Sequence, residues 1–357
     1  MAEQEAILES LRGVVDPGLE RNIVSTALVH DLAVSDGKVS FKLQSVRASG
    51  PEADALLEKA KQAAGSVAGV SGVEASLTSA ARLSPAGEKG GIPGVANIIP
   101  VASGKGGVGK STVSTNLAVA LRETGARVGI LDADVYGPSI PTILGATQSP
   151  QQGGKGIIPV VQHGVRMIST GFFVRPDQAV VWRGPMLAKM VDQLINQVEW
   201  GELDYLLIDL PPGTGDVQLT LCQRVALTGA VIVTTPQPVA VQVAEKAIIM
   251  FNQLKTPLLG VVENMSYYES RTTGEREFIF GSGGAEHVAE HWKIPLLGKI
   301  PLATTVREHS DSGHPILLAD PEAPASKAFR HVAMELIAET SIRNQKAAAE
   351  GLVEINF

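Results

Sequence analysis

A glycine-rich run in the first third of the chain constrains the fold most. Residues 103–112 read Ser-Gly-Lys-Gly-Gly-Val-Gly-Lys-Ser-Thr and satisfy the phosphate-binding pattern G-x-x-x-x-G-K-[ST]. Glycines let successive backbone N–H groups turn inward around phosphate oxygens, and a following helix presents its positive end to them. The run predicts a nucleotide site in which Lys110 contacts the β- and γ-phosphates and Ser111 ligates Mg²⁺. The residues predicted to bind the phosphates are Gly104, Gly106, Gly107, Val108, Gly109, Lys110, Ser111 and Thr112.

The segments on either side of this loop agree with it. Residues 97–102 are almost all apolar and predict a short buried strand, and residues 111–123 predict a helix. Strand, glycine loop and helix in this order are the context that the motif requires. The alternative is a chance glycine-rich turn before a helix, which this context disfavours.

Beyond residue 96, apolar strand patterns alternate with helical ones. This alternation predicts an α/β domain with a mainly parallel sheet covered by helices on both faces. The predicted strands are 97–102, 126–131, 165–170, 204–209, 229–235, 257–262 and 295–300.

Acidic residues follow two of these strands. Asp132 and Asp134 end the segment 127–134, and Asp209 ends the segment 204–209. In a parallel sheet, the carboxyl ends of the strands lie beside the bound ligand. We therefore expect Asp209 to hold Mg²⁺ through water and Asp132 to lie near the metal. The alternative for both acids is the capping of a strand or helix end, a common use of aspartate.

A second lysine, Lys105, follows the first glycine of the loop and gives the pattern K-G-G-x-G-K-[ST]. This resembles the deviant Walker A group, which includes MinD, ParA, the nitrogenase iron protein and the Mrp/ApbC proteins. The resemblance implies that Lys105 reaches the phosphates of a partner subunit in a nucleotide-sandwich homodimer. A second cation there would stabilise charge during phosphoryl transfer. The alternative is a solvated loop cation.

Three further blocks, 132–141, 209–216 and 263–266, resemble signatures of the Mrp/ApbC family over roughly residues 95–345. The resemblance implies a Mg²⁺-dependent ATPase that carries iron–sulfur clusters to apoproteins. By the same resemblance, Asp134 positions or activates the attacking water, Gly213 senses the γ-phosphate and Asn264 reads the adenine base.

The chain departs from the family where the cluster would bind. Carriers of the family have a Cys-x-x-Cys pair after Glu-Asn-Met-Ser, and here Ser270 and Thr273 occupy those positions. The whole chain has one cysteine, Cys222, so a dimer supplies two thiolates where a common cluster takes four. This speaks against a bridged cluster. It leaves open a cluster-free ATP-dependent regulatory or scaffold switch that partners a cysteine-bearing relative or client.

Residues 1–80 predict a separate small α+β domain. It resembles the SufT-like domain fused to some Mrp proteins, although Gly50-Pro51 replaces the Cys-Pro of that family. Residues 81–95 predict a flexible linker, 96–345 the ATPase domain and 346–357 a tail. Within the small domain, helices are predicted at 6–15 and 51–67 and strands at 24–34, 38–46 and 72–78, the first two joined by a hairpin turn at Ser35-Asp36-Gly37.

Composition limits the class further. The 357 residues are 44% hydrophobic and carry a net charge of −7, which indicates a globular protein with little nonspecific affinity for nucleic acid or anionic membranes. No apolar stretch reaches the roughly 18 residues of a membrane span, and a secretory signal pattern is lacking. The low cysteine usage is typical of a reducing compartment, so we expect a cytoplasmic protein.

Overall fold

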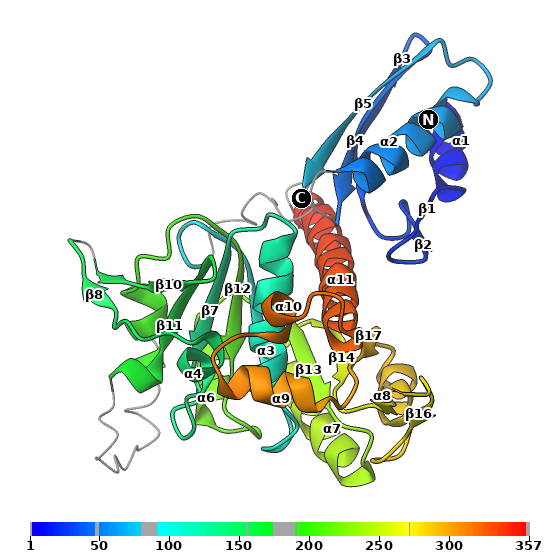
Figure 1. Cartoon of the computed structure of the whole chain (residues 1–357). Coiled ribbons are helices and arrows are strands. Elements are labelled where there is room, and N and C mark those ends of the chain that lie inside the picture. The colour runs from blue at the N-terminus through cyan, green and yellow to red at the C-terminus, as the bar shows by residue number, and fades with distance from the viewer. Residues whose placement is uncertain are drawn as a thin grey trace.

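The structure is a computed structural model that describes residues 2–46, 50–79, 91–154, 156–173, 190–191, 193–270 and 272–354. It shows a small domain, a larger layered domain and a long carboxyl-terminal helix that runs from one to the other (Figure 1). None of the described helices is long and apolar enough to cross a membrane.

The small domain packs two helices on a three-stranded sheet with the strand order β3-β4-β5. Asp36 and Gly37 both have positive φ angles of 50° and 76°, which suits the tight turn that joins β3 to antiparallel β4. The strand predicted from Val24 begins only at Val29, because residues 23–28 form a turn closed by the Leu28 N–H bond to Ile23 O. The elements are α1 (Ala2–Arg12), β1 (Val15–Asp16), β2 (Arg21–Asn22), β3 (Val29–Ser35), β4 (Lys38–Ser45), α2 (Pro51–Gly65) and β5 (Gly72–Ser79).

The larger domain is built on an eight-stranded sheet with the order β10-β11-β7-β12-β6-β13-β14-β17. All seven predicted strands lie in it and pair in parallel, so the predicted α/β fold is confirmed. The strands are β6 (Val95–Ser103), β7 (Val128–Asp132), β10 (Val160–Gln162), β11 (Val165–Ser169), β12 (Leu203–Asp209), β13 (Ala230–Thr234), β14 (Leu258–Glu263) and β17 (Leu296–Lys299).

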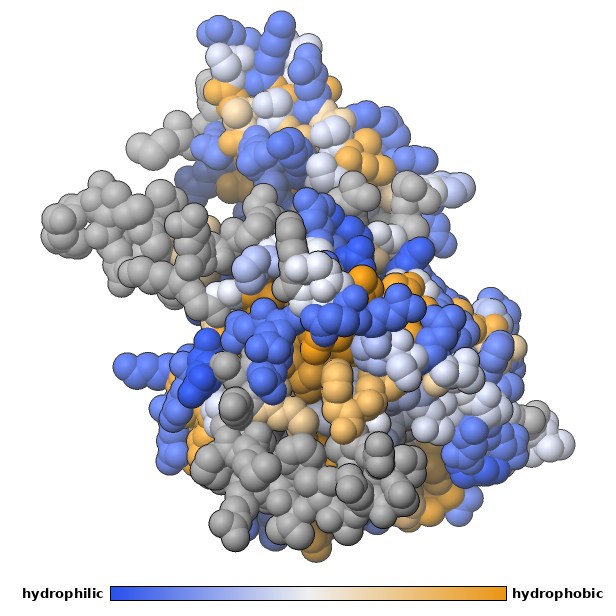
Figure 2. All heavy atoms as spheres, turned by 90° about the vertical axis from the view of Figure 1, so that its left-hand side faces the viewer, coloured by the Kyte–Doolittle hydropathy of each residue, from blue (hydrophilic) through white to orange (hydrophobic). Residues whose placement is uncertain are grey.

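The sequence did not indicate β10, which pairs antiparallel with β11 at one edge of the sheet. The side chain of Val161 on this strand is 58% exposed, and nearby Ile158 is 44% exposed. Figure 2 shows the molecule from this side, where hydrophobic residues lie at the surface among hydrophilic ones. A strand of three residues offers few unpaired backbone groups to another chain, so the edge is short enough to limit sheet extension.

Helices cover both faces of the sheet because successive strand residues point to opposite sides. On β6, Ile99 and Val101 belong to the core beneath α3 and α11, whereas Ile98 and Ala102 belong to the core beneath α6, α7 and α8. The predicted helix at 111–123 is confirmed as α3. The helices are α3 (Lys110–Glu123), α4 (Ile140–Leu144), α6 (Asp216–Arg224), α7 (Pro238–Gln253), α8 (Gly284–Trp292), α9 (Thr304–Asp311), α10 (Ile316–Ala319) and α11 (Pro324–Glu354). Short additional elements are β8 (Gln151–Gln152), β9 (Ile157–Ile158), η1 (Thr170–Phe172), β15 (Tyr268–Glu269) and β16 (Arg276–Glu277).

Helix α11 joins the two domains. Its Glu335 and Glu339 accept hydrogen bonds from the Arg21 guanidinium of the small domain at 3.1 and 2.7 Å, and Ser341 Oγ donates to the carbonyl of Ala27 at 2.9 Å. The helix continues past residue 345, where the sequence predicted the ATPase domain to end. The predicted linker lies largely outside the described residues, so the division of the chain at 80, 95 and 345 stays a prediction.

Candidate nucleotide site

The glycine loop connects the end of β6 to the start of α3, as its sequence predicts. Gly107 and Gly109 have φ angles of 84° and 78°, a region that side chains with a Cβ rarely adopt. Gly104 is needed for a different reason, because a Cβ there would lie 2.1 Å from the backbone carbon of Val243 on α7. The loop therefore combines left-handed turns with a close backbone contact, which explains its glycine content.

The loop lines a cavity of about 400 Å³ at the carboxyl edge of the sheet. Eight of the predicted site residues line it, namely Lys105, Gly106, Gly107, Gly109, Lys110, Ser111, Thr112 and Asp134. Residues from other elements complete the lining, namely Ser103, Pro138, Ser139, Thr142, Ile143, Pro212, Ser310 and Asp311. The last two come from α9, about 200 residues after the loop, and nothing in the sequence placed them here.

Asp209, at the end of β12, is the centre of the polar network beside the cavity. Its side chain is fully buried. Oδ2 accepts hydrogen bonds from Lys110 Nζ at 2.7 Å and Ser111 Oγ at 2.6 Å, and Oδ1 accepts one from Ser114 Oγ at 2.6 Å. A serine hydroxyl beside a carboxylate offers the oxygen ligands that Mg²⁺ prefers, so Ser111 and Asp209 fit the predicted metal. The sequence did not single out Ser114.

Asp134 also lines the cavity and lies close to Lys110. Its carboxylate Oδ2 is 3.9 Å from Lys110 Nζ, and Oδ1 accepts a hydrogen bond from the Gly137 N–H at 3.3 Å. Burial raises the pKa of Asp134 above its ordinary value, the charge of Asp209 adds to this, and Lys110 opposes it. A carboxylate that lines the cavity beside Lys110, the lysine predicted to bind phosphate, is placed where a water could be positioned.

Asp132 is fully buried, and backbone groups surround its carboxylate. Oδ1 accepts a hydrogen bond from the Asp134 N–H at 3.2 Å. Oδ2 accepts from the N–H groups of Ser139 and Ile140 and from Ser169 Oγ, at 3.1, 3.2 and 2.9 Å. Burial and the nearby Asp209 raise the pKa of Asp132 to about 7. These contacts favour the capping alternative, in which Asp132 closes the loop that carries Asp134. Its metal role stays a prediction.

Asn264 and Gly213 contact the loop or the strand end that precedes it. Asn264 Nδ2 donates to the carbonyl of Val108 at 2.8 Å, and the Gly213 N–H donates to the carbonyl of Ser103 at 3.0 Å. Neither Asn264 nor Gly213 lines the cavity in this structure, so their roles toward adenine and γ-phosphate stay predictions. Lys105 Nζ lies 3.5 Å from Gln237 Oε1.

The hairpin after Glu-Asn-Met-Ser carries Ser270 and Thr273 at its turn, between β15 and β16. Ser270 Oγ accepts hydrogen bonds from the N–H groups of Thr272 and Thr273. Thr273 Oγ1 contacts a carboxylate oxygen of Glu275 at 3.3 Å. Both hydroxyls therefore make their contacts within the turn itself.

Cys222 lies on α6 and is partly buried against the core on that face of the sheet. Burial raises its pKa to about 11, so at neutral pH it is a thiol and not the thiolate that binds metals. Within the described ranges, no group of three or more His, Cys, Asp or Glu side chains is placed to hold a metal ion. The site near Asp209 differs from such a group because it combines carboxylates with a serine hydroxyl.

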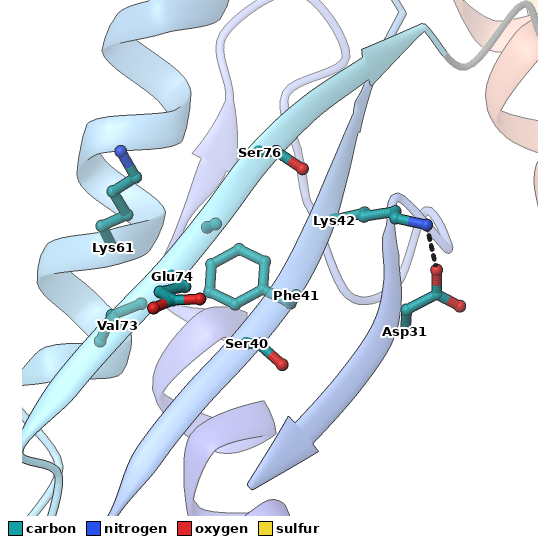
Figure 3. A pocket seen from close by; sticks show the side chains of 9 residues that line it. Asp31, Ser40, Phe41, Lys42, Lys61, Val73, Glu74 and Ser76 are labelled. Carbon is teal, nitrogen blue, oxygen red and sulfur yellow. Dashed lines mark ion pairs between the residues drawn. The ribbon is translucent and has the colours of Figure 1, made fainter.

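A larger hollow, of about 520 Å³, lies on the small domain (Figure 3). Phe41 and Val73 line it together with polar residues, and Lys42 and Asp31 form an ion pair of 2.8 Å at its side. Its lining contains no glycine loop that could bind phosphates. The smaller cavity at the glycine loop is therefore the candidate nucleotide site.

Comparison with known families agrees with this architecture. Residues 94–337 match the family described as NUBPL iron-transfer P-loop NTPases (ParA), and residues 4–77 match the family of iron–sulfur cluster assembly proteins. The chain therefore belongs to the NUBPL family of iron-transfer P-loop NTPases. This confirms the resemblance seen in the sequence, and the second match corresponds to the SufT-like domain.

Curated relatives of this NUBPL-family protein are similar over nearly the whole chain. It is 43% identical to the iron–sulfur cluster carrier protein of Synechocystis over 351 residues, 96% of this chain and 99% of that protein. It is also 43% identical to the iron–sulfur cluster carrier protein of Escherichia coli K12 over 326 residues, 90% of this chain and 88% of that one.

Solved structures support the same fold. The nucleotide-binding protein of Archaeoglobus fulgidus in complex with ADP is 42% identical, with a TM-score of 0.58 over 65% of this chain and 91% of that chain. The cell division ATPase MinD of Pyrococcus furiosus is 26% identical, with a TM-score of 0.51 over 67% of this chain and 97% of that chain. The larger domain is thus a nucleotide-binding P-loop NTPase domain of the MinD/ParA type.

Proposed function

We propose that the protein is a Mg²⁺-dependent ATPase that acts, as a nucleotide-sandwich homodimer, in the assembly of iron–sulfur clusters or their transfer to apoproteins. The observation that carries the ATPase proposal is that Lys110 and Ser111 both bond buried Asp209, while Asp134 lies 3.9 Å from Lys110 beside the same cavity. The family and the names of the relatives support the iron–sulfur role.

In the proposed reaction, residues of the chain position the phosphates and the attacking water and stabilise the phosphate charge. Backbone N–H groups of the loop and Lys110 bind the β- and γ-phosphates, so Lys110 exchanges its contact with Asp209 for one with phosphate. Ser111 and Asp209 would hold Mg²⁺, which neutralises phosphate charge when bound. Asp134 accepts a hydrogen bond from the water whose oxygen attacks the γ-phosphorus while the bond to ADP breaks.

The proposed dimer assigns Lys105 to the partner's phosphates. Within its own chain, Lys105 Nζ lies 3.5 Å from Gln237 Oε1, a long contact that the ammonium group can leave at little cost. We expect Lys105→Ala to lower kcat about a hundredfold, as the loss of one group that stabilises transition-state charge does. Steady-state phosphate release measures this, with Gln237→Ala as the control for the contact within the chain.

A mixing experiment separates action across the dimer from action within one chain. When Lys105→Ala is mixed with a variant that lacks the Asp134 carboxylate, one site of each mixed dimer has an intact Asp134 and receives an intact Lys105 from the other chain. We therefore expect the mixture to regain activity. Two inactive proteins that stay inactive when mixed would contradict the trans role.

The second part of the proposal concerns the iron–sulfur cluster. The hairpin that carries Ser270 and Thr273 provides evidence on whether the protein binds one. Hydroxyl groups are poor substitutes for the thiolates that hold these clusters, and those of Ser270 and Thr273 contact their own turn. This observation favours the second candidate function, a cluster-free ATP-dependent regulatory or scaffold switch that works with a cysteine-bearing relative or client.

Iron and sulfide analysis after anaerobic reconstitution tests the cargo. We expect the wild-type dimer to retain no stoichiometric iron, because its hairpins supply no thiolates. The matched variant Ser270→Cys/Thr273→Cys supplies two per chain and is expected to gain iron with the absorbance of a bridged cluster. Stoichiometric iron and sulfide on the wild type would contradict the cluster-free function and support a carrier.

A further inference from the structure

Among the side-chain donors to Asp209 in the part of the chain that the structure describes, Ser114 is the one without a predicted contact to nucleotide or metal. It lies one helical turn after Ser111 on α3 and is fully buried. Residues three apart share one face of a helix, which directs both hydroxyls toward the end of β12. Ser114 does not line the nucleotide cavity, so its hydroxyl faces the protein side of Asp209.

The two carboxylate oxygens of Asp209 have different partners. Oδ2 is shared by Lys110 and Ser111, and Oδ1 is bonded to Ser114 at 2.6 Å. In the proposed function, Lys110 would bind the phosphates and Ser111 would ligate Mg²⁺. Oδ2 would then lose both donors and become available to the metal. The hydrogen bond from Ser114 to Oδ1 would remain.

The hydrogen of the Ser114 hydroxyl has two acceptors within reach. Ser114 Oγ is 2.6 Å from Asp209 Oδ1 and 3.0 Å from the carbonyl of Lys110. A hydroxyl donates one hydrogen at a time, and a bond to a charged acceptor is shorter and stronger than one to a neutral carbonyl. The Lys110 carbonyl lies in the first turn of α3, where the backbone ladder supplies a donor. The hydroxyl therefore donates to the carboxylate.

We propose that Ser114 is a positioning residue, which holds Asp209 Oδ1 so that Oδ2 faces the Mg²⁺ site when Lys110 and Ser111 move to their ligands. This rests on the proposed function. A carboxylate that is fully buried needs hydrogen-bond donors in place of the water that it has lost. Ser114 supplies the donor that does not move.

The test is the Mg²⁺ dependence of nucleotide binding by full-length Ser114→Ala, measured with ADP by calorimetry over a range of Mg²⁺ concentrations and in EDTA. We expect the Mg²⁺ concentration for half-maximal tightening of ADP to rise roughly 10-fold to 100-fold, which corresponds to the loss of one hydrogen bond to a charged group. Affinity for ADP in EDTA is expected to stay unchanged. Ser114→Thr, which keeps the hydroxyl, is expected to restore the wild-type Mg²⁺ dependence.

Thr115→Val is the matched control. Thr115 is also buried on α3, but its hydroxyl donates to the backbone carbonyl of Ser111 at 2.8 Å and not to Asp209. We expect its Mg²⁺ dependence to match the wild type. Where Ser114→Ala fails to fold, Ser114→Cys, which is close in size and a weak donor, carries the same expectation.

Two results would overturn the inference while leaving the proposed function intact. One is a Mg²⁺ dependence of Ser114→Ala equal to that of the wild type. The other is an equal loss of ADP affinity in EDTA and in Mg²⁺, which indicates a general packing defect. A wild-type protein whose ADP affinity does not respond to Mg²⁺ would overturn the metal part of the proposed function and this inference with it.

Discussion

Replacing Lys110 by alanine is expected to abolish ATP binding and to destabilise the protein at the same time. Lys110 is buried, with 6% of its side chain exposed, and contacts the fully buried Asp209 at 2.7 Å. Its removal takes away the cation proposed to bind the phosphates and leaves a buried carboxylate without its charge partner. Breaking such a pair from one side costs about 3 kcal/mol of unfolding free energy. Calorimetric titration with ATP and urea unfolding measure the two effects.

A double variant separates these effects. Lys110→Ala/Asp209→Asn removes both charges, so we expect it to recover much of the lost unfolding free energy while ATP binding stays absent. Lys246→Ala, which removes an exposed lysine on α7, is the control for loss of a positive charge and is expected to bind ATP as the wild type does. An ATP affinity of Lys110→Ala equal to that of the wild type would contradict the proposed site.

Replacing Asp134 by asparagine is expected to lower kcat about a thousandfold, within the range for loss of a group that assists proton transfer. ATP should still bind, because the asparagine keeps a side-chain oxygen for the bond from the Gly137 N–H and the loop residues are unchanged. Single-turnover hydrolysis measures the chemical step, and an equilibrium titration measures ATP affinity. A matched loss of affinity and turnover would show that Asp134 binds ATP and does not act in hydrolysis.

Asp320→Asn provides the control for loss of a negative charge. Asp320 follows α10 and is exposed, outside the lining of the nucleotide cavity. We expect both kcat and ATP affinity to match the wild type. A kcat of Asp134→Asn equal to that of this control would contradict the assigned role.

The local parts of the site follow from the sequence because they depend on neighbouring residues. The loop from Gly104 to Gly109 needs glycine for its left-handed turns and its close contact with α7. Asp209 is predictable for a related reason, since an apolar segment that ends in an acid delivers that acid to the carboxyl edge of a parallel sheet.

The parts that the sequence missed depend on pairings between distant segments. The bond between Ser114 and Asp209 spans 95 residues, and that between Ser169 and Asp132 spans 37. Ser310 reaches the cavity because α9 packs beside α4. A single sequence contains no signal for such contacts, because they follow from the order of the strands and the packing of the helices on them.

Asp132 is the clearest example of a residue whose contacts the sequence does not indicate. Its sequence position next to the metal site is compatible with a ligand and with a cap, and only the structure shows four donors around its carboxylate. By itself, then, the sequence determined the phosphate loop, the parallel α/β fold and the missing thiolates at Ser270 and Thr273, since these depend on residue type and local spacing. The tertiary structure decided which donors hold each buried carboxylate, because burial makes hydrogen-bond partners obligatory and only packing selects them.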